Sequence, residues 1–196
     1  MNIALHLEFS QVIRKAVEKE LDIKLDALSF MYGNIKPDVI RTSIPHYKHT
    51  AMEFVQTEIE KLASLKFNKS KKWLKHFSGR LGIITHYLAD FFCYAHSEVF
   101  QGDIMSHFLY EFWQSYYFIR SQKVVCWYIP MTPTYLQLSA NYLTSCIEAA
   151  HDRYRSILKD NLFLYEWDTA NAVSICVIVC VALISMCIEN QLKFAV

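Results

Sequence analysis

The sequence predicts a single all-α domain, a compact multi-helix fold that spans residues 1–196. The 196 residues are enough for one domain with a full core, and 53% of them are hydrophobic. Glycine and proline, which interrupt regular structure, occur only four times each. Between these interruptions, apolar residues recur at the three- and four-residue spacing of a helix face. The three observations together favour helices connected by short loops.

The apolar spacing also locates the individual helices. A first helix is indicated by the stripe of Leu5, Phe9, Ile13 and Val17. We expect further helices over residues 48–65, 73–93, 104–121, 135–158 and 166–196. Turn chemistry and Pro37 predict a break over residues 32–38, and loops are expected over residues 42–45 and in the basic segment 66–72. Residues 124–129 have the composition of a short strand, although no nearby segment would pair with it.

The C-terminal helix, at about residues 168–190, has two possible environments. No charged residue occurs from Ala172 to Ile188. A helix that spans a bilayer needs about 20 apolar residues, with about 17 as the lower limit. A helix enclosed by other helices is also apolar on all sides. The segment is therefore either a core helix or a membrane-associated helix.

Charge and composition narrow the class of protein. The high aromatic content of 15% and the net charge of +1 exclude intrinsic disorder. The same near-neutral charge argues against nucleic acid as the main partner. The six cysteines form no CxxC pair, and the N-terminus lacks the basic start and apolar stretch of a signal peptide. We expect a cytoplasmic protein, with membrane association as the alternative if the C-terminal helix inserts.

Two histidine–carboxylate pairs carry the clearest chemical signal. His86 and Asp90 are four residues apart, and His107 and Glu111 repeat that spacing on the next predicted helix. Residues four apart lie on the same face of a helix, so each pair points in one direction. His96 lies between the two pairs. Since the surroundings are apolar and an unpaired buried carboxylate is costly, metal coordination would satisfy the whole set.

The number of these residues indicates more than one metal ion. A catalytic zinc ion commonly takes three protein ligands and water, and three histidines with two carboxylates exceed that number. Two or more ions bridged by a carboxylate such as Asp90 account for the set. A lone histidine on an apolar helix is more often an ordinary core or surface residue, and we interpret His76 and His151 in that way.

The segment from Leu81 to Glu111 resembles the zinc-dependent phospholipase C family, the type of the alpha-toxin N-terminal domain and the phosphatidylcholine-preferring phospholipases. The matching pattern is HxxxD, a histidine six residues after the aspartate, and HxxxE about a dozen residues later. Upstream, the Pro37–Asp38 loop and the His46–Tyr47 pair are similar to the family's corresponding motifs. His6 on the first helix matches its N-terminal histidine. The resemblance covers about residues 2–114.

The resemblance implies an all-helical fold with two or three Zn²⁺ ions, shared by this family and the single-strand nucleases. One zinc would be held by His46, His86 and Asp90, with Asp38 as a further ligand or general base. A second would be held by His96, His107 and Glu111. A third would be shared by His6, Asp90 and the chain's amino terminus. His49 is the alternative to His46, because the loop after Asp38 is shorter here than in the toxins.

The resemblance further implies a hydrolase that uses zinc to cleave a phosphodiester. The expected substrate is a phospholipid or a small soluble phosphodiester, and contact with a membrane surface would accompany a lipid substrate. One alternative is a single-strand nuclease-like phosphodiesterase, against which the low net charge counts. Another is a non-catalytic helical zinc protein, associated with a membrane through its C-terminal helix. The oligomeric state stays open.

Overall fold

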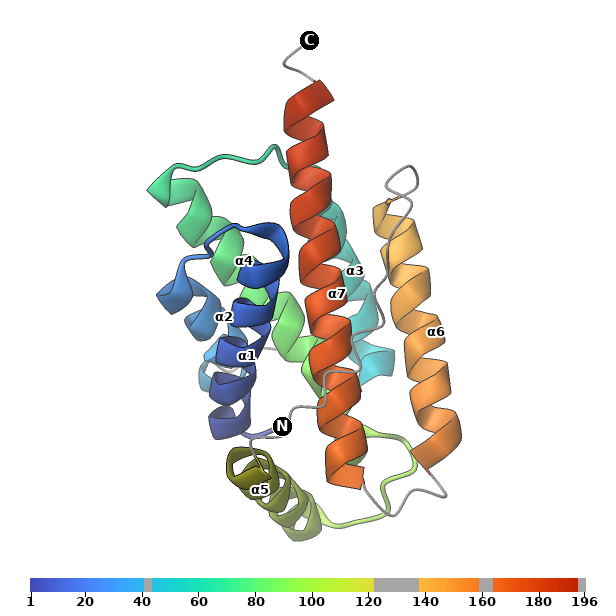
Figure 1. The fold of residues 1–196 in the computed structure, drawn as a ribbon. Coiled ribbons are helices and arrows are strands. Elements are labelled where there is room, and N and C mark those ends of the chain that lie inside the picture. Colours follow the sequence, from blue (N-terminus) through green and yellow to red (C-terminus); the bar gives the residue numbers. More distant parts are fainter. Residues whose placement is uncertain (41–43, 122–137, 159–163, 194–196) are drawn as a thin grey trace.

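The computed structural model describes residues 1–40, 44–121, 138–158 and 164–193, and these residues form an all-helical bundle without strands (Figure 1). The elements are α1 (Ile3–Leu21), α2 (Ala27–Val39), α3 (Lys48–Ala63), α4 (Lys71–Phe91), the short 3₁₀ helix η1 (Tyr94–His96), α5 (Ile104–Ser121), α6 (Ala140–Leu158) and α7 (Leu164–Lys193). The prediction of an all-α fold is confirmed. The suggested strand over residues 124–129 lies outside the described residues.

Helix α7 runs through the middle of the bundle (Figure 1). It contacts α1, α3, α4, α5 and α6, and its apolar residues from Ala172 to Cys187 are mostly buried. By length and composition it is the one helix among the described residues that could cross a membrane, and 72% of its most apolar window is buried in the bundle. In this structure it therefore has the surroundings of a core helix.

Helices α2 and α4 cross in direct backbone contact. A Cβ atom on Gly33 would lie 2.2 Å from the carbonyl oxygen of Gly79, and one on Gly82 would lie 2.3 Å from that of Phe30. Only glycine permits so close an approach. This crossing brings the C-terminal half of α2 against the face of α4 that carries the HxxxD pair.

The predicted break over residues 32–38 is wrong, because α2 continues through it to Val39. Asn34 is buried, where its amide donates to the Phe30 carbonyl (3.0 Å) and its side-chain oxygen accepts a hydrogen bond from Thr85 (3.0 Å). Pro37 lies in the last turn, where it interrupts little of the helix. Packing against α4 thus outweighs the turn preferences of Gly33, Asn34 and Pro37.

The expected helices over residues 48–65, 73–93 and 104–121 agree with the structure to within two residues. Of the expected helix 135–158, residues 138 and 139 are non-helical and α6 begins at Ala140, and the expected helix 166–196 corresponds to α7 up to Lys193. Residues 135–137 and 194–196 lie outside the described residues. Helix α5 matches residues 104–121, and α3 and α4 begin and end close to the expected positions. The expected basic loop over residues 66–72 is shorter, because Ser70 caps α4 and the helix begins at Lys71. The described part of the 42–45 loop, Ile44 and Pro45, is non-helical.

Helix α5 lies at one end of the bundle, near the start of α1 and α7 (Figure 1). Phe118 of α5 packs edge-on against Phe9 of α1, with ring centroids 5.0 Å apart. Ser115 donates to the side chain of Asn2, the N-cap of α1 (2.7 Å). These contacts hold the inner face of α5 against the chain's first residues.

Candidate metal centre

The carboxylate of Asp90 is the centre of a cluster of histidines. Asp90 is fully buried on the last turn of α4. Its Oδ2 lies 2.7 Å from His46 Nδ1 and 3.4 Å from His86 Nε2. Its Oδ1 lies 3.3 Å from His6 Nε2 and forms an ion pair with the amino group of Met1. One carboxylate thus faces groups from α1, α4 and the segment before α3.

A first group of possible ligands consists of His6, Asp38 and His86, whose ligand atoms all lie within 4.8 Å of one another. The α2–α4 crossing places Asp38 Oδ1 3.8 Å from His86 Nε2. His86 Nδ1 donates to the Asn34 carbonyl at 2.7 Å, because a carbonyl can only accept. That bond leaves His86 Nε2 free to face the cluster with its lone pair, an arrangement typical of metal-binding histidines.

A second group consists of His46, His86 and Asp90, again with ligand atoms within 4.8 Å of one another. His46 lies in the loop before α3 and its side chain is 22% exposed, so this group is open to solvent on one side. His49, the alternative to His46, is 58% exposed and lies beside Glu98 rather than in the cluster. The structure therefore brings His46, and not His49, to Asp90.

A third group consists of His96 on η1 and the His107–Glu111 pair on α5. Glu111 Oε1 lies 2.9 Å from His96 Nε2 and 2.9 Å from His107 Nε2. The Met1 amino group lies 2.9 Å from His96 Nε2 and 3.2 Å from Glu111 Oε1. Since that amino group also pairs with Asp90, it joins the third group to the other two.

The electrostatics of the cluster favour the protonation states that bind metals. Burial and the neighbouring His6 lower the pKa of His86 well below its ordinary value, and burial with the amino terminus lowers that of His96. Burial alone would raise the pKa of Asp90, but the amino terminus and His96 outweigh it and bring the pKa well down. Neutral imidazoles beside an ionised carboxylate are the forms that coordinate zinc.

Asp38 and His46 lie at the edge of the cluster, and the pKa of each is raised. Burial raises the pKa of the Asp38 carboxyl, which is only 18% exposed. Burial would lower the pKa of His46, but the hydrogen bond to Asp90 and the charge of Asp90 raise it. Asp38 is therefore the carboxyl of the cluster best suited to accept a proton.

Unpaired buried atoms provide a test of whether the residues fit metal ions. Among the described residues, neither ring nitrogen of the fully buried His6 makes a hydrogen bond, and Asp38 Oδ2 has no hydrogen-bond partner. Buried polar atoms without partners are rare, and a metal ion that accepts the lone pair of one His6 ring nitrogen and of Asp38 Oδ2 explains these two atoms. Imidazole nitrogens and carboxylate oxygens are also the donors that Zn²⁺ prefers. The donor set therefore fits zinc.

The structure brings together every residue that the sequence singled out as a site candidate: His6, Asp38, His46, His86, Asp90, His96, His107 and Glu111. His6 lies close to both Asp38 and Asp90. The three ligand groups therefore share more residues than the three separate zinc sites that were expected. His76 lies on the surface and His151 is buried, and neither is in the cluster.

Asp168 supports the third group and was not anticipated from the sequence. This buried residue of α7 accepts hydrogen bonds from the Tyr154 hydroxyl (2.6 Å), the Tyr110 hydroxyl (2.8 Å), the Tyr94 backbone N–H (2.8 Å) and the Gln114 amide (3.2 Å). Burial raises its pKa to about 7 despite these bonds. The available signal was an acid close to the start of a long uncharged run. Two of its partners, Tyr94 and Tyr110, lie within two residues of His96 and Glu111 in the sequence.

Comparison with known proteins agrees with this geometry. A family model described as zinc-dependent phospholipase C matches residues 5–161. The match includes every candidate ligand from His6 to Glu111. Neither the curated proteins nor the solved structures with which the chain was compared gave a match. The chain belongs to the zinc-dependent phospholipase C family, a family of hydrolases.

Proposed function

We propose that the protein is a phospholipase C-like phosphodiester hydrolase that works with two or three Zn²⁺ ions. The observation that carries the proposal is the shared position of Asp90, whose carboxylate faces three histidines and lies beside a third ligand group. His46, His86 and Asp90 would hold one ion, His96, His107 and Glu111 a second, and His6 with Asp38 or Asp90 a third. Zinc supplies positive charge that polarises a phosphoryl group and makes water more acidic.

The chain's own residues supply proton transfer and orientation. Asp38 lies at the solvent side of the cluster with an unpaired Oδ2, and its raised pKa suits a general base. It would take the proton from the water that attacks phosphorus. The Asn34 carbonyl accepts from His86 Nδ1 and so fixes the orientation in which His86 Nε2 faces the cluster. The family's substrate class supports a phospholipid headgroup as the substrate.

Metal content and activity of Asp90→Asn test the proposal. We expect two or three zinc equivalents per chain in the parent by elemental analysis, and at most one in the variant, because the bridging charge is lost. Hydrolysis of a soluble phosphodiester such as p-nitrophenylphosphocholine should fall at least about 100-fold. The exposed Asp152→Asn is the matched control and should keep both properties. A full zinc complement in Asp90→Asn would show that the cluster is wrongly assigned.

A further inference from the structure

The outer side of α5 is an exposed apolar stripe. Every exposed residue of this helix except Ser106 and Arg120 is large and apolar or aromatic: Ile104, Met105, Phe108, Leu109, Phe112, Trp113, Tyr116 and Ile119. Their exposed fractions run from 47% at Tyr116 to 76% at Ile104. Spacings of three and four residues align them along the whole helix, which is about 27 Å long.

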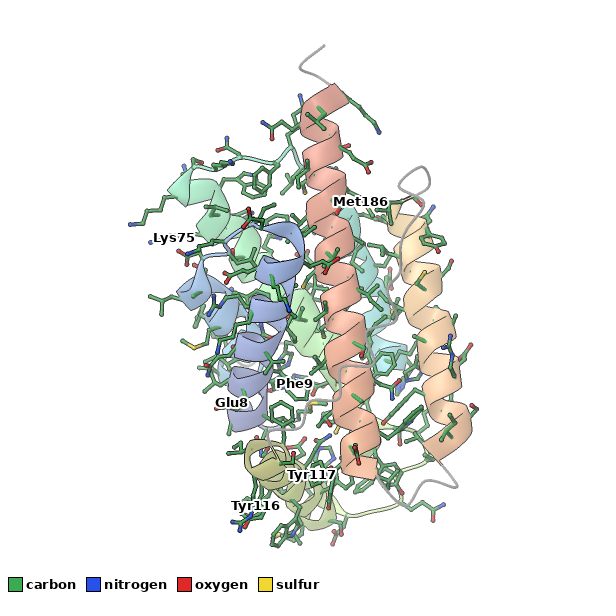
Figure 2. All side chains as sticks on the ribbon, in the orientation of Figure 1. Glu8, Phe9, Lys75, Tyr116, Tyr117 and Met186 are labelled. Carbon is green, nitrogen blue, oxygen red and sulfur yellow. The ribbon has the colours of Figure 1, made fainter. Side chains whose placement is uncertain are left out.

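An exposed apolar stripe of this length indicates a binding surface. Single exposed apolar residues are ordinary, but soluble proteins rarely expose contiguous apolar surface of this extent unless it binds something. Figure 2 shows Tyr116 and Tyr117 at the end of the bundle formed by α5, with Tyr117 beside the start of α7. Among the described residues, no other helix exposes so long a run of large apolar side chains.

The inner side of the same helix carries part of the metal centre. His107 and Glu111 face His96, and Gln114, Ser115 and Phe118 are buried against the bundle. A helix with its side chains is about 10 Å across. Any surface that covers the stripe therefore lies within about 10 Å of the third ligand group.

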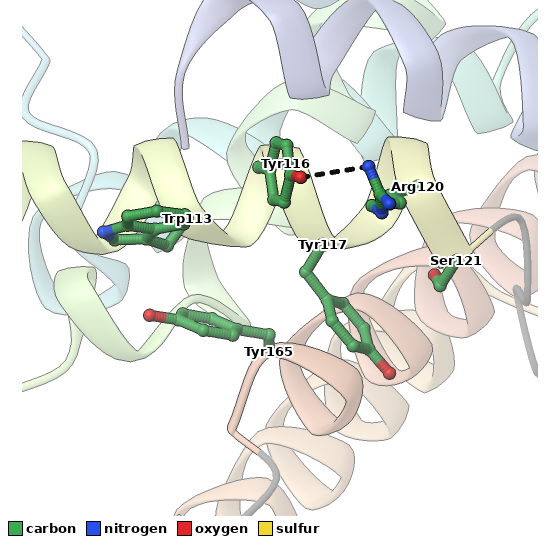
Figure 3. Close-up of a pocket in the computed structure, with 6 residues that line it drawn as sticks. All are labelled: Trp113, Tyr116, Tyr117, Arg120, Ser121 and Tyr165. Carbon is green, nitrogen blue, oxygen red and sulfur yellow. Dashed lines mark hydrogen bonds between the residues drawn. The ribbon is translucent and has the colours of Figure 1, made fainter.

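The polar groups at the C-terminal end of α5 match lipid headgroups. Trp113, Tyr116, Tyr117, Arg120, Ser121 and Tyr165 line an open cavity of about 630 Å³ (Figure 3). Arg120 donates to the Tyr116 hydroxyl at 3.2 Å, and it is the one exposed charged residue of the helix. Asp103, just before the helix, is held by the amide and hydroxyl of Ser106. Arg120 is thus the one exposed charge on α5 itself and can pair with a lipid phosphate, whereas Asp103, just before the helix, keeps its negative charge.

We propose that the exposed face of α5 docks on the surface of a phospholipid bilayer. Apolar side chains would enter the acyl boundary, while Trp113, Tyr116 and Arg120 would lie at headgroup level, where these residue types are favoured. Docking in this way brings phospholipid headgroups within about one helix diameter, roughly 10 Å, of the third ligand group. The inference rests on the proposed function, since it takes the phospholipid substrate as the reason for the contact.

Vesicle binding by a stripe variant tests this inference. Leu109→Ser/Phe112→Ser removes two apolar side chains from the middle of the stripe, and Leu28→Ser/Leu192→Ser removes two exposed apolar side chains elsewhere. In co-sedimentation with phosphatidylcholine vesicles, we expect the stripe variant to bind at least about tenfold more weakly than the parent. The control variant should bind as the parent does. Zinc content and hydrolysis of the soluble phosphodiester should be unchanged in both.

The outcomes separate the two proposals. Equal vesicle binding by parent and stripe variant overturns the docking surface, even if the soluble substrate is still hydrolysed. A parent that is dimeric by light scattering, becomes monomeric in the stripe variant and binds no vesicles also overturns it, in favour of a second copy of the chain. Vesicle binding that maps to α5 in a protein without zinc or hydrolase activity supports the surface and contradicts the proposed function.

Discussion

His151 is a buried histidine that stays apart from the metal centre. Its side chain packs edge-on against Phe92, with ring centroids 5.6 Å apart, and is only 6% exposed. Burial, with the charges of Lys48 and Arg155, lowers its pKa to about 4. In the unfolded chain this histidine binds a proton below about pH 6.5, whereas in the folded protein it stays neutral until the pH falls to about 4.

This difference predicts a pH-dependent loss of stability. The contribution is fully present above pH 6.5 and is lost as the pH falls toward 4. Between pH 7.5 and 5.5 the loss is about 1 kcal/mol. Measured by urea denaturation between pH 7.5 and 5.5, the free energy of unfolding of His151→Leu should fall by about 1 kcal/mol less than that of the parent. His76→Leu, at an exposed histidine, should keep the parent's pH dependence; an unchanged slope in His151→Leu would contradict the assignment.

At the scale of elements, the α2–α4 crossing sets the geometry of the first ligand group. A Cβ atom on Gly82 would lie 2.3 Å from the Phe30 carbonyl oxygen and 3.0 Å from the Asn34 amide nitrogen. A Cβ atom on Gly79 would meet nothing nearer than 3.7 Å. The two glycines are one turn apart on α4, yet only Gly82 holds the helices at backbone distance.

Gly82→Ala and Gly79→Ala form a matched pair of variants. We expect Gly82→Ala to force α2 away from α4 and to lower the free energy of unfolding by about 2 kcal/mol. It should also weaken zinc binding, because the bond between Asn34 and His86 is strained. Gly79→Ala should be neutral or stabilising by up to about 1 kcal/mol, since alanine is the better helix former. Urea denaturation and zinc titration measure both effects, and equal behaviour of the two variants would contradict the argument.

Asp168 joins α7 to η1, α5 and α6 through one buried carboxylate. Asp168→Ala would leave the donors on Tyr94, Tyr110 and Tyr154 without their acceptor, and we expect it to cost at least about 3 kcal/mol of unfolding free energy. Zinc bound by His96 should also be held less tightly. The exposed Asp152→Ala should change stability by less than about 0.5 kcal/mol. The two variants are compared by urea denaturation in parallel. A loss of less than about 1 kcal/mol in Asp168→Ala would refute this role.

What the sequence could predict depends on the range of the interaction. The i, i+4 spacing of His86 with Asp90 and of His107 with Glu111 is local, so it identified four of the eight site candidates and the helices that carry them. The candidates His6, Asp38 and His46 came from the resemblance to the family. The continuous helix α2 was missed, because its cause is the contact of Gly33 with α4, about fifty residues away. The role of Asp168 was missed for the same reason: its partners come from three other elements.

At the scale of the whole molecule, the cluster connects elements that are distant in sequence. His6 comes from α1, Asp38 from α2, Asp90 from α4, His96 from η1 and Glu111 from α5. Bound zinc would therefore stabilise the bundle as a whole, because the unfolded chain does not assemble this site.

Metal removal should consequently lower the melting temperature. After treatment with a chelator and its removal, we expect the parent to melt about 5–10 °C lower than the zinc-loaded protein, as saturation of a tight site implies. Adding zinc should restore the original temperature, whereas adding magnesium should not, since histidine nitrogens suit zinc better. Differential scanning calorimetry is the measurement. Identical melting with and without zinc would contradict a cluster that spans the bundle.

The central position of α7 has a consequence for the order of events during synthesis. Residues 164–193 are made after the helices that carry the candidate ligands and lie beyond the family match, yet α1, α3, α4, α5 and α6 all pack against them. The helices that carry the candidate ligands would leave the ribosome before the surface that holds them together exists. Their apolar faces would stay exposed until residues 164–193 are made, and exposed apolar surface of this kind makes a folding chain prone to aggregation. A chain that stops near residue 161 would hold every candidate ligand and lack the helix around which they assemble.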